Sequence, residues 1–248
     1  MLIAGFLNID ETTFLAASMI RFIKVLHQGS IIIRDLNPDT IFIKRNGYAC
    51  LNRLGAAKIL RNDSDERFNT LVGTPHYMAV ELIRKQPYSY PVDYWSLGIT
   101  IFELLAGFVP FAQDTDDPIE IYETVLLQQL TFPPFLSKKE YEPFKDLISQ
   151  CLEQNPKKRL VEGIEMLERH PVFRDFDWEA LDRRTLESPL TNWSVLSDQH
   201  NYVQRRLASG LKLEDLLPSQ LKTEAGLAES CSDPADWENF IHRKFGEG

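Results

Sequence analysis

The chain has 248 residues, of which 44% are hydrophobic and 25% charged, a balance that suits one packed domain or one domain with an appendage. Its net charge of −9 makes binding to nucleic acid or to an anionic membrane surface unexpected, whereas a cationic peptide is a compatible partner. Three scattered cysteines without metal-ligand spacing indicate reduced thiols, and residues 1–7 lack the basic start of a signal peptide. We therefore expect an intracellular, cytoplasmic protein.

The first half of the chain alternates helical and strand patterns. Asp10 and Glu11 can cap an amphipathic helix that we expect to end near Gly29. Short apolar runs then predict two strand pairs between residues 31 and 60, with a turn at Asn46 and Gly47. The polar residues 61–67 predict an exposed loop.

The second half is mainly helical. Residues 91–106 are apolar nearly all round, which predicts a buried helix and, because Glu103 interrupts the apolar stretch, not a membrane span. Further helices are expected at 118–130, 138–153 and 161–169. After Pro189 the composition becomes polar, so we predict a domain at 1–190 and a partly disordered tail at 191–248, with short helices at 194–206 and 211–217.

One segment organises the chain. It reads Ile33-Arg34-Asp35-Leu36-x-x-x-Thr40 and is followed by Arg53-Leu54-Gly55. An Arg-Asp dipeptide alone is usually a surface ion pair. Here the segment resembles the catalytic loop of protein kinases, H-R-D-L-x-x-x-N, followed by D-F-G.

Further motifs occur in the order expected of a kinase. Residues 73–81 resemble the G-T-P-x-Y-x-A-P-E segment, residues 93–98 the start of the buried central helix, and residues 155–159 a segment that supplies a structural arginine. The resemblance implies a mainly α fold, the large C-terminal lobe of a kinase, with short β-hairpins at the catalytic loop. No Gly-rich loop or V-A-I-K lysine is found, so we expect the small lobe, and any cyclic-nucleotide-binding domain, to be absent from this chain.

The residues at the end of the domain indicate which group of kinases the chain resembles. Residues 170–181 and 185–189 are similar to the end of the cyclic-nucleotide-dependent kinases of the AGC group, and most resemble the cGMP-dependent kinase. The pair Trp237 and Phe240 resembles the W-x-x-F motif of that group. The tail at 191–248 is therefore expected to be of AGC type.

The resemblance implies several structural roles. Glu81 and Arg159 should form a buried ion pair, and Asp93 should bond the backbone of the catalytic loop. Thr70 matches the phosphorylated threonine of the activation loop, whose phosphate would meet Arg34 and Lys58. The alternative is that Thr70 is unmodified and that acidic residues of the loop at 61–67 form ion pairs with Arg34 and Lys58.

The nucleotide-binding positions have changed. Asp35 stands at the proton-acceptor position, but Thr40 and Arg53 replace both metal ligands, and arginine repels Mg²⁺. Mg-ATP is the cofactor of the family, and we predict that this chain has no cofactor. Arg53 could fill the vacant metal position as a tethered cation, face solvent, or pair with Asp35. Phe42 could cover the nucleotide site, although core packing is the simpler expectation.

The residues at the family's peptide-binding positions have changed less than those at its nucleotide-binding positions. Asp39 and Glu103 fall where the family binds arginine, and the pocket for an apolar residue would be lined by Leu71, Pro75 and Met78. A carboxylate such as Glu103 within an apolar helix needs a partner, which could be an arginine of the peptide or an internal arginine.

Three functions remain open from the sequence. The first is a non-catalytic, pseudokinase-like fragment that binds a basic peptide, a kinase or a regulatory protein. The second is a degenerate serine/threonine kinase that needs a separate small lobe. The third is a truncated gene product without a settled function. A large lobe without its small lobe would expose apolar surface around Leu54 and the helix before the catalytic loop, so we expect instability or a partner.

Overall fold

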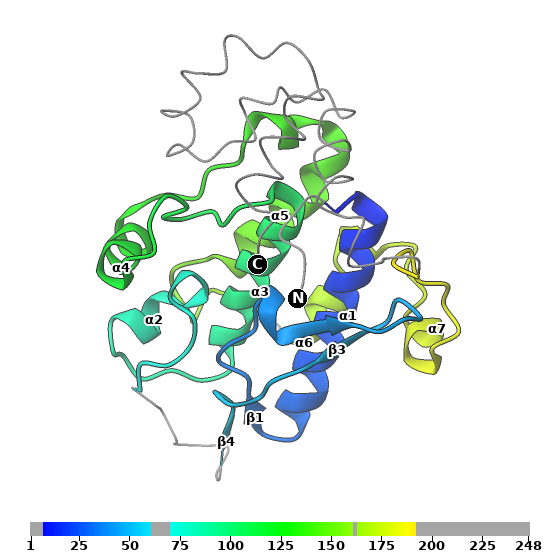
Figure 1. Cartoon of the computed structure of the whole chain (residues 1–248), viewed down its shortest axis with the longest axis horizontal. Coiled ribbons are helices and arrows are strands. Elements are labelled where there is room, and N and C mark those ends of the chain that lie inside the picture. Colours follow the sequence, from blue (N-terminus) through cyan, green and yellow to red (C-terminus); the bar gives the residue numbers. More distant parts are fainter. Residues whose placement is uncertain (1–6, 61–69, 161–162, 192–248) are drawn as a thin grey trace, which may run out of the picture. The chain divides into compact units, whose positions relative to one another are not determined.

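A computed structural model describes residues 7–60, 70–160 and 163–191 (Figure 1). The chain divides into two units, Met1–Arg205 and Arg206–Gly248, and all the described residues belong to the first. The loop predicted at 61–67, both predicted tail helices and the Trp237 motif lie outside the described residues. The domain boundary near residue 190 stays a prediction.

Helices account for most of the regular structure in the described residues. The α-helices are α1 (Ile9–Gln28), α2 (Val80–Ile83), α3 (Pro91–Ala106), α4 (Pro118–Leu127), α5 (Glu142–Cys151), α6 (Ile164–Glu168) and α7 (Trp178–Arg183). The 3₁₀ turns are η1 (Pro38–Thr40), η2 (Pro75–Tyr77), η3 (Pro134–Ser137), η4 (Lys139–Tyr141) and η5 (Pro171–Phe173). The strands are β1 (Ile31–Ile32), β2 (Ile41–Ile43), β3 (Ala49–Leu51) and β4 (Lys58–Ile59). Among the described residues, no helix is both long and apolar enough to span a bilayer.

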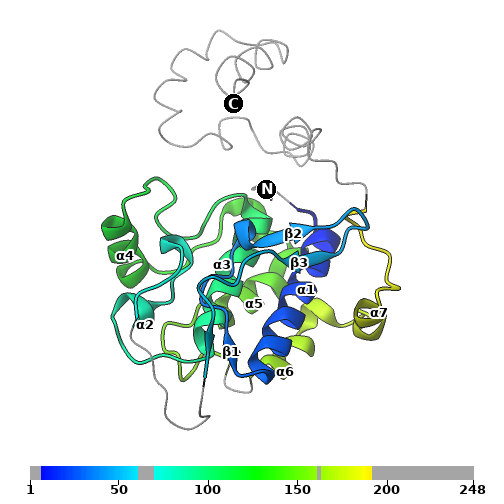
Figure 2. The same cartoon turned by 60° about the horizontal axis from the view of Figure 1, so that its bottom comes forward.

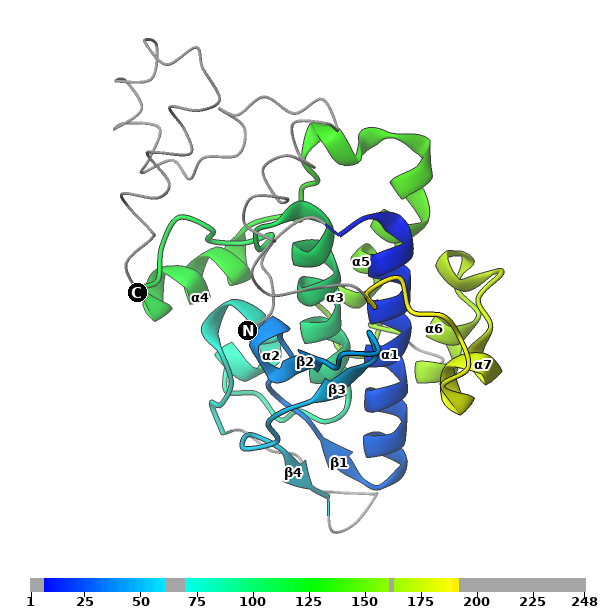
Figure 3. The ribbon, with the colours of Figure 1, turned by 45° about the vertical axis from the view of Figure 1, so that its right-hand side comes forward.

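Helix α3 is the centre of the fold, and its predicted bounds are confirmed. It begins at Pro91, whose missing N–H costs nothing in the first turn, and ends before Gly107, which adopts the left-handed conformation (φ 78°). Every residue of α3 except Pro91 and Glu103 is buried. Helix α1 lies along one side of α3, and α5 also packs against α3 (Figures 2 and 3).

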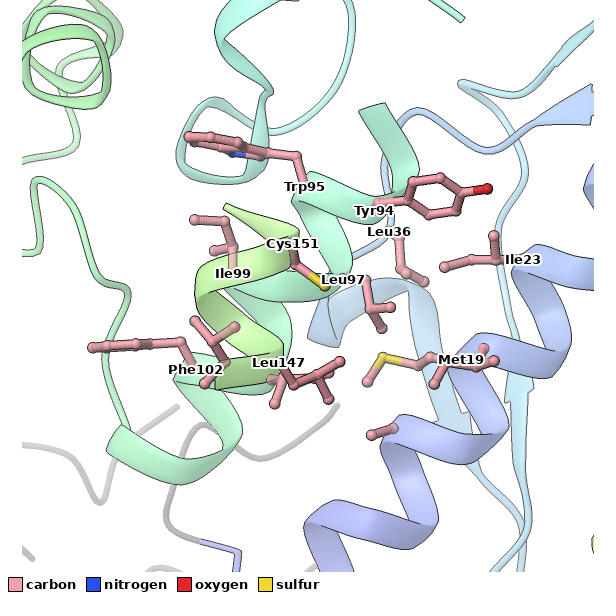
Figure 4. Packing of buried hydrophobic residues seen from close by; sticks show 14 of the residues in the cluster. Met19, Ile23, Leu36, Tyr94, Trp95, Leu97, Ile99, Phe102, Leu147 and Cys151 are labelled. Carbon is pink, nitrogen blue, oxygen red and sulfur yellow. The ribbon is translucent and has the colours of Figure 1, made fainter. Parts of the chain in front are cut away.

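Helix α1 carries the second wall of the core. Asn8 and Glu11 form a capping box, so the helix begins at Ile9, slightly before the predicted start, and Gly29 caps its end as predicted. Figure 4 shows Met19 and Ile23 of α1 facing Leu97 of α3. This contact is part of one continuous hydrophobic core.

A close approach joins α3 to α5. A Cβ atom at Gly98 would lie 2.6 Å from the Cβ atom of Cys151, so only glycine fits this crossing. Burial against α3 raises the pKa of the Cys151 thiol to about 12, so the thiol stays protonated. Cys151 is free of any disulfide.

The two predicted strand pairs are confirmed, and both are antiparallel. Strand β1 pairs with β4, and β2 pairs with β3. In the second pair Ile41 faces Leu51, and the turn contains Gly47 at φ 77°. These strands hold the loop between β1 and β2 in place.

Three helices are shorter than predicted. Helix α4 ends at Leu127 because the chain becomes extended at Gln128. Helix α5 starts at Glu142, since Pro143 has no N–H to continue a helix from the preceding 3₁₀ turn. Helix α6 starts at Ile164, because Gly163 adopts a non-helical conformation (φ 78°, ψ −162°); residues 161–162 lie outside the description.

A buried ion pair ties the segment before α3 to the segment after α5. Arg159 donates to both carboxylate oxygens of Glu81, at 2.7 and 3.1 Å, and its side chain is 0% exposed. The Arg159 guanidinium also donates to the carbonyl of Pro91 at 3.0 Å and lies 5.0 Å from the Trp95 ring centroid. The structure therefore contains the pair that the sequence resemblance implies.

Substituting Glu81→Ala should lower the free energy of unfolding by about 3–5 kcal/mol, because the Arg159 charge would stay buried without its partner. Urea denaturation measures the loss. Glu179→Ala is the matched control, since Glu179 pairs with Arg183 at the surface, with side chains 71% and 69% exposed. That control should change stability by less than about 1 kcal/mol. Equal losses in the two variants would contradict the prediction.

Candidate functional site

The loop that contains Asp35 is held by one buried carboxylate. The backbone N–H groups of Ile33 and Arg34 donate to the two oxygens of Asp93, at 2.8 and 2.7 Å. His27, from the last turn of α1, lies 2.7 Å from the same carboxylate through Nε2. Asp93 is 0% exposed, so these groups satisfy it in place of water. No sequence motif indicates this role of His27, although its position in the last helical turn before the loop is consistent with it.

A second segment lies against this loop. Gly73 adopts φ 115°, and a Cβ atom there would lie 2.7 Å from the carbonyl oxygen of Arg34. Only glycine allows this close approach, which brings Thr74 next to Asp35.

Asp35 is oriented through one of its two carboxylate oxygens. Oδ1 accepts hydrogen bonds from the backbone N–H of Thr74 (2.9 Å), the Thr74 hydroxyl (2.8 Å) and Asn37 Nδ2 (2.9 Å). Among the residues that the structure describes, none donates to Oδ2. The group is a fixed carboxylate with one oxygen open to accept a proton.

Thr40 is committed to the turn that it ends. Its hydroxyl accepts from the backbone N–H of Asn37 at 3.1 Å and donates to the Asn37 carbonyl at 2.8 Å. Thr40 is 2% exposed, and Asn37 is 3% exposed. The Asn37 side chain accepts from the Asp39 N–H at 3.0 Å, which completes a capping box around η1. The hydroxyl at this position is therefore used by the protein itself.

Arg53 is exposed and lies outside any ion pair among the described residues. This is the arrangement expected of the solvent-facing alternative, and no pairing with Asp35 is seen. The expectation that Phe42 packs in the core is wrong. Phe42 is 49% exposed, because β2 turns Ile41 inward and the next side chain outward.

Leu54 is 46% exposed, so the apolar surface that the sequence predicts around it is present among the described residues. Ile33, which directly precedes Arg34, is 1% exposed and belongs to the hydrophobic core.

Arg34 connects the loop to Thr70. Its Nε donates to the Ala56 carbonyl at 2.6 Å, and its Nη1 donates to the Tyr88 hydroxyl at 2.9 Å. Tyr88 in turn donates to the carbonyl of Thr70 at 3.1 Å. Thr70 is exposed, as is Lys58 on β4. The competing acidic residues of 61–67 lie outside the described residues.

Glu103 is the polar group of the buried helix, and its partner is Tyr77. The Tyr77 hydroxyl donates to Glu103 Oε2, so the alternative of an internal arginine partner is wrong for the described residues. Burial raises the pKa of Glu103, the hydrogen bond from Tyr77 opposes this, and the charge of Asp39 raises the pKa further. The pKa of Tyr77 is also raised, chiefly by burial.

The predicted apolar pocket is only partly accessible. Leu71 is 40% exposed and Pro75 is partly buried, whereas Met78 is 5% exposed and can form only the floor. His76, on η2 between Pro75 and Tyr77, has Nε2 within 3.2 Å of the carbonyl oxygens of Ala112 and Thr115. This contact joins η2 to the loop before α4.

Comparison with known proteins agrees with this arrangement. The family described as protein kinase domain matches residues 2–173. The chain belongs to the protein kinase family. It is 37% identical over 193 residues to a cGMP-dependent protein kinase of Plasmodium berghei, covering 77% of this chain and 22% of that protein. It is 38% identical over 180 residues to the cAMP-dependent protein kinase catalytic subunit PRKX of Homo sapiens, covering 71% of this chain and 48% of PRKX.

The predicted resemblance to AGC kinases, and to the cGMP-dependent kinases among them, is thereby confirmed. A cGMP-dependent protein kinase of Eimeria tenella is 33% identical over 214 residues, or 85% of this chain and 20% of that protein. The chain thus spans about a fifth of the cGMP-dependent kinases and about half of PRKX. In the described residues of this kinase domain, no three His, Cys, Asp or Glu side chains gather as metal ligands.

Asp93→Asn should lower the free energy of unfolding by about 3 kcal/mol. The side-chain amide would place its own N–H group against one of the backbone N–H groups that now donate to the carboxylate, and a buried donor would lose its acceptor. Hydrogen exchange should show the largest loss of protection at the amides of Ile33 and Arg34. Asp146→Asn is the control, since Asp146 accepts from His170 with its own side chain 59% exposed. Unchanged protection at Ile33 and Arg34 would refute this role of Asp93.

Proposed function

We propose that this chain is the large-lobe part of a protein kinase domain that does not transfer phosphate and acts by binding a basic peptide or a protein partner. The proposal rests on the residues that occupy the two positions at which the family holds metal ions. The Thr40 hydroxyl is committed to the Asn37 backbone, and Arg53 places a cation where a carboxylate is needed.

The chemistry of phosphoryl transfer makes these positions decisive. Transfer depends on positioning and on neutralising phosphate charge with metal ions held by protein oxygens. An arginine stays protonated and repels Mg²⁺, and a buried hydroxyl with both of its roles used is a poor ligand. The residues present therefore do not fit Mg-ATP, and we derive no step through it.

Two further residues support the same proposal. Asn37 stands where the family has a lysine, and its side chain bonds Asp35 and Thr74 instead of facing a phosphate. Asp35 retains an open oxygen, but a general base alone contributes only about 10²–10⁴-fold to a rate. The loop keeps its shape by internal hydrogen bonds.

The second candidate is a degenerate serine/threonine kinase that becomes active when a small lobe completes it. The well-ordered Asp35 carboxylate is the observation in its favour. The exposed side chains of Phe42 and Leu54 are expected of any large lobe without its small lobe, so they do not favour the third candidate, a truncated product without a settled function. A broad or absent unfolding transition of the purified chain would support this third candidate.

With Mg-ATP and an R-R-x-S/T peptide, the chain should incorporate no more labelled phosphate than its Asp35→Asn variant does, because the metal ligands are missing. Mg-ATP should also leave its melting temperature unchanged. PRKX serves as the positive control. Incorporation that is abolished by Asp35→Asn would overturn the proposal and establish the degenerate kinase.

Peptide binding is supported by the carboxylates of Asp39 and Glu103. Asp39 is exposed, and its negative charge contributes to the raised pKa of Glu103. Within the described residues, neither carboxylate forms an ion pair with lysine or arginine. A peptide arginine would relieve their mutual repulsion and supply the missing cation. Leu71 and Pro75 add apolar contact nearby.

Binding of an R-R-x-S/T peptide should weaken as the pH falls through the raised pKa of Glu103, since only the ionised carboxylate attracts arginine. The loss should begin above pH 4.5, the ordinary value for this group, because burial and Asp39 raise the pKa. Isothermal titration at successive pH values measures it. Glu103→Gln should weaken binding and remove this part of the pH dependence. A Glu103→Gln variant with wild-type affinity would exclude the site.

A further inference from the structure

A groove lies on the side of the molecule formed by the end of α3, α4 and the segments flanking α4. Its volume is about 640 Å³, within the range of ligand-binding pockets. The lining includes residues from positions 102 to 134, and neither Asp35 nor Glu103 is among them. The groove is therefore separate from both sites already described.

The floor of the groove is aromatic. Phe102 lies 5.9 Å from Phe108 and 5.8 Å from Phe132, measured between ring centroids. In Figure 4 the Phe102 side chain points away from Met19 and α1. Phe132 already has the Lys145 ammonium 5.6 Å from its ring centroid, and Lys145 is itself paired with Glu142 at 2.8 Å. Phe102 is 1% exposed, so the partly buried rings of Phe108 and Phe132 provide the aromatic surface that a cation can reach.

The wall of the groove carries negative charge. Asp114 and Glu120 line it, and the lining contains no lysine or arginine. Glu120 lies in the first turn of α4 and is exposed. Thr124, one turn further along the helix, lines the same wall. Acidic walls over an aromatic floor are complementary to a guanidinium or ammonium group.

The groove is also connected to the candidate peptide site. Ala112 and Thr115, two of its lining residues, provide the carbonyl oxygens that His76 contacts. His76 lies next to Tyr77, the partner of Glu103. A groove and a site joined through two consecutive residues of η2 can be reached by parts of the same partner.

We propose that this groove docks a cationic segment of a partner protein, with an arginine or lysine placed over the aromatic floor and paired with Glu120. The docking is a second contact beside the site at Glu103 and does not depend on that site being the peptide site. Its occupant is an extended basic segment, because the groove is open, acidic and aromatic.

The test uses the full chain with Asp39→Asn and Glu103→Gln, which removes the first candidate site. The probe is a short fluorescein-labelled peptide of alternating arginine and alanine, and its matched neutral probe replaces each arginine by citrulline. Fluorescence anisotropy should show binding of the arginine peptide that falls with added salt, and much weaker binding of the citrulline peptide. Equal binding of the two probes would overturn the proposal in favour of an apolar occupant.

Two substitutions on α4 locate the binding. Glu120→Lys should weaken binding about tenfold, which is a loss of 1.4 kcal/mol. Glu123→Lys is the matched control, because it makes the same charge change on the same helix at an exposed residue outside the groove lining, and it should weaken binding far less. Thr124→Trp should block the groove by size without changing charge. Equal effects of Glu120→Lys and Glu123→Lys would refute the groove.

The remaining outcomes separate this inference from the proposed function. If peptide binding disappears completely in the Asp39→Asn, Glu103→Gln chain while unfolding remains cooperative, the groove fails and the site at Glu103 stands. If Glu103→Gln alone leaves peptide binding unchanged but Glu120→Lys weakens it, the site at Glu103 fails and the groove stands. Concentration-dependent self-association that Thr124→Trp abolishes would identify a second copy of the chain as the occupant and overturn the proposal.

Discussion

The hydrogen bonding of the buried Asp93 carboxylate is the constraint on which the rest of the structure depends. It joins three elements: α3, which carries it; α1, through His27; and the loop after β1, through the N–H groups of Ile33 and Arg34. A carboxylate that is 0% exposed must be fully satisfied, so its donors have little freedom to move. Arg34 accordingly adopts a left-handed conformation (φ 66°), and Asp35 follows it toward Thr74.

From that anchor the loop is stabilised by its own side chains. Asn37 bonds Asp35 and Thr74 on one side and the backbone of η1 on the other, and Thr40 closes the turn. These side chains bond each other, so the hydrogen bonds among them set the shape of the loop. That shape is a property separate from catalytic capacity.

The turn η2 contacts both of the regions that carry the carboxylates discussed above. Tyr77 and His76 are neighbours on η2, yet Tyr77 reaches Glu103 in α3 and His76 reaches the loop before α4. One short turn thus connects a carboxylate pair with an aromatic groove. Both features favour a cationic partner, because cations gain from carboxylates and from aromatic rings alike.

From the sequence one could predict the order of helices α1, α3, α4, α5 and α6, both strand pairs, the kinase family and the pairing of Glu81 with Arg159, but not the short helices α2 and α7. Helical and strand periodicity, and motifs several residues long, are local signals that survive without tertiary information. Only the structure showed that Phe42 is exposed, that Tyr77 is the partner of Glu103 and that His27 supports Asp93. Both of these partnerships depend on elements that meet across long sequence separations, as Glu103 and Tyr77 do across 26 residues. The use of the Thr40 hydroxyl depends instead on the local turn η1, in which it bonds Asn37 three residues away. Burial and hydrogen-bond partners are set by that packing, whereas a motif specifies only the residue type at a position.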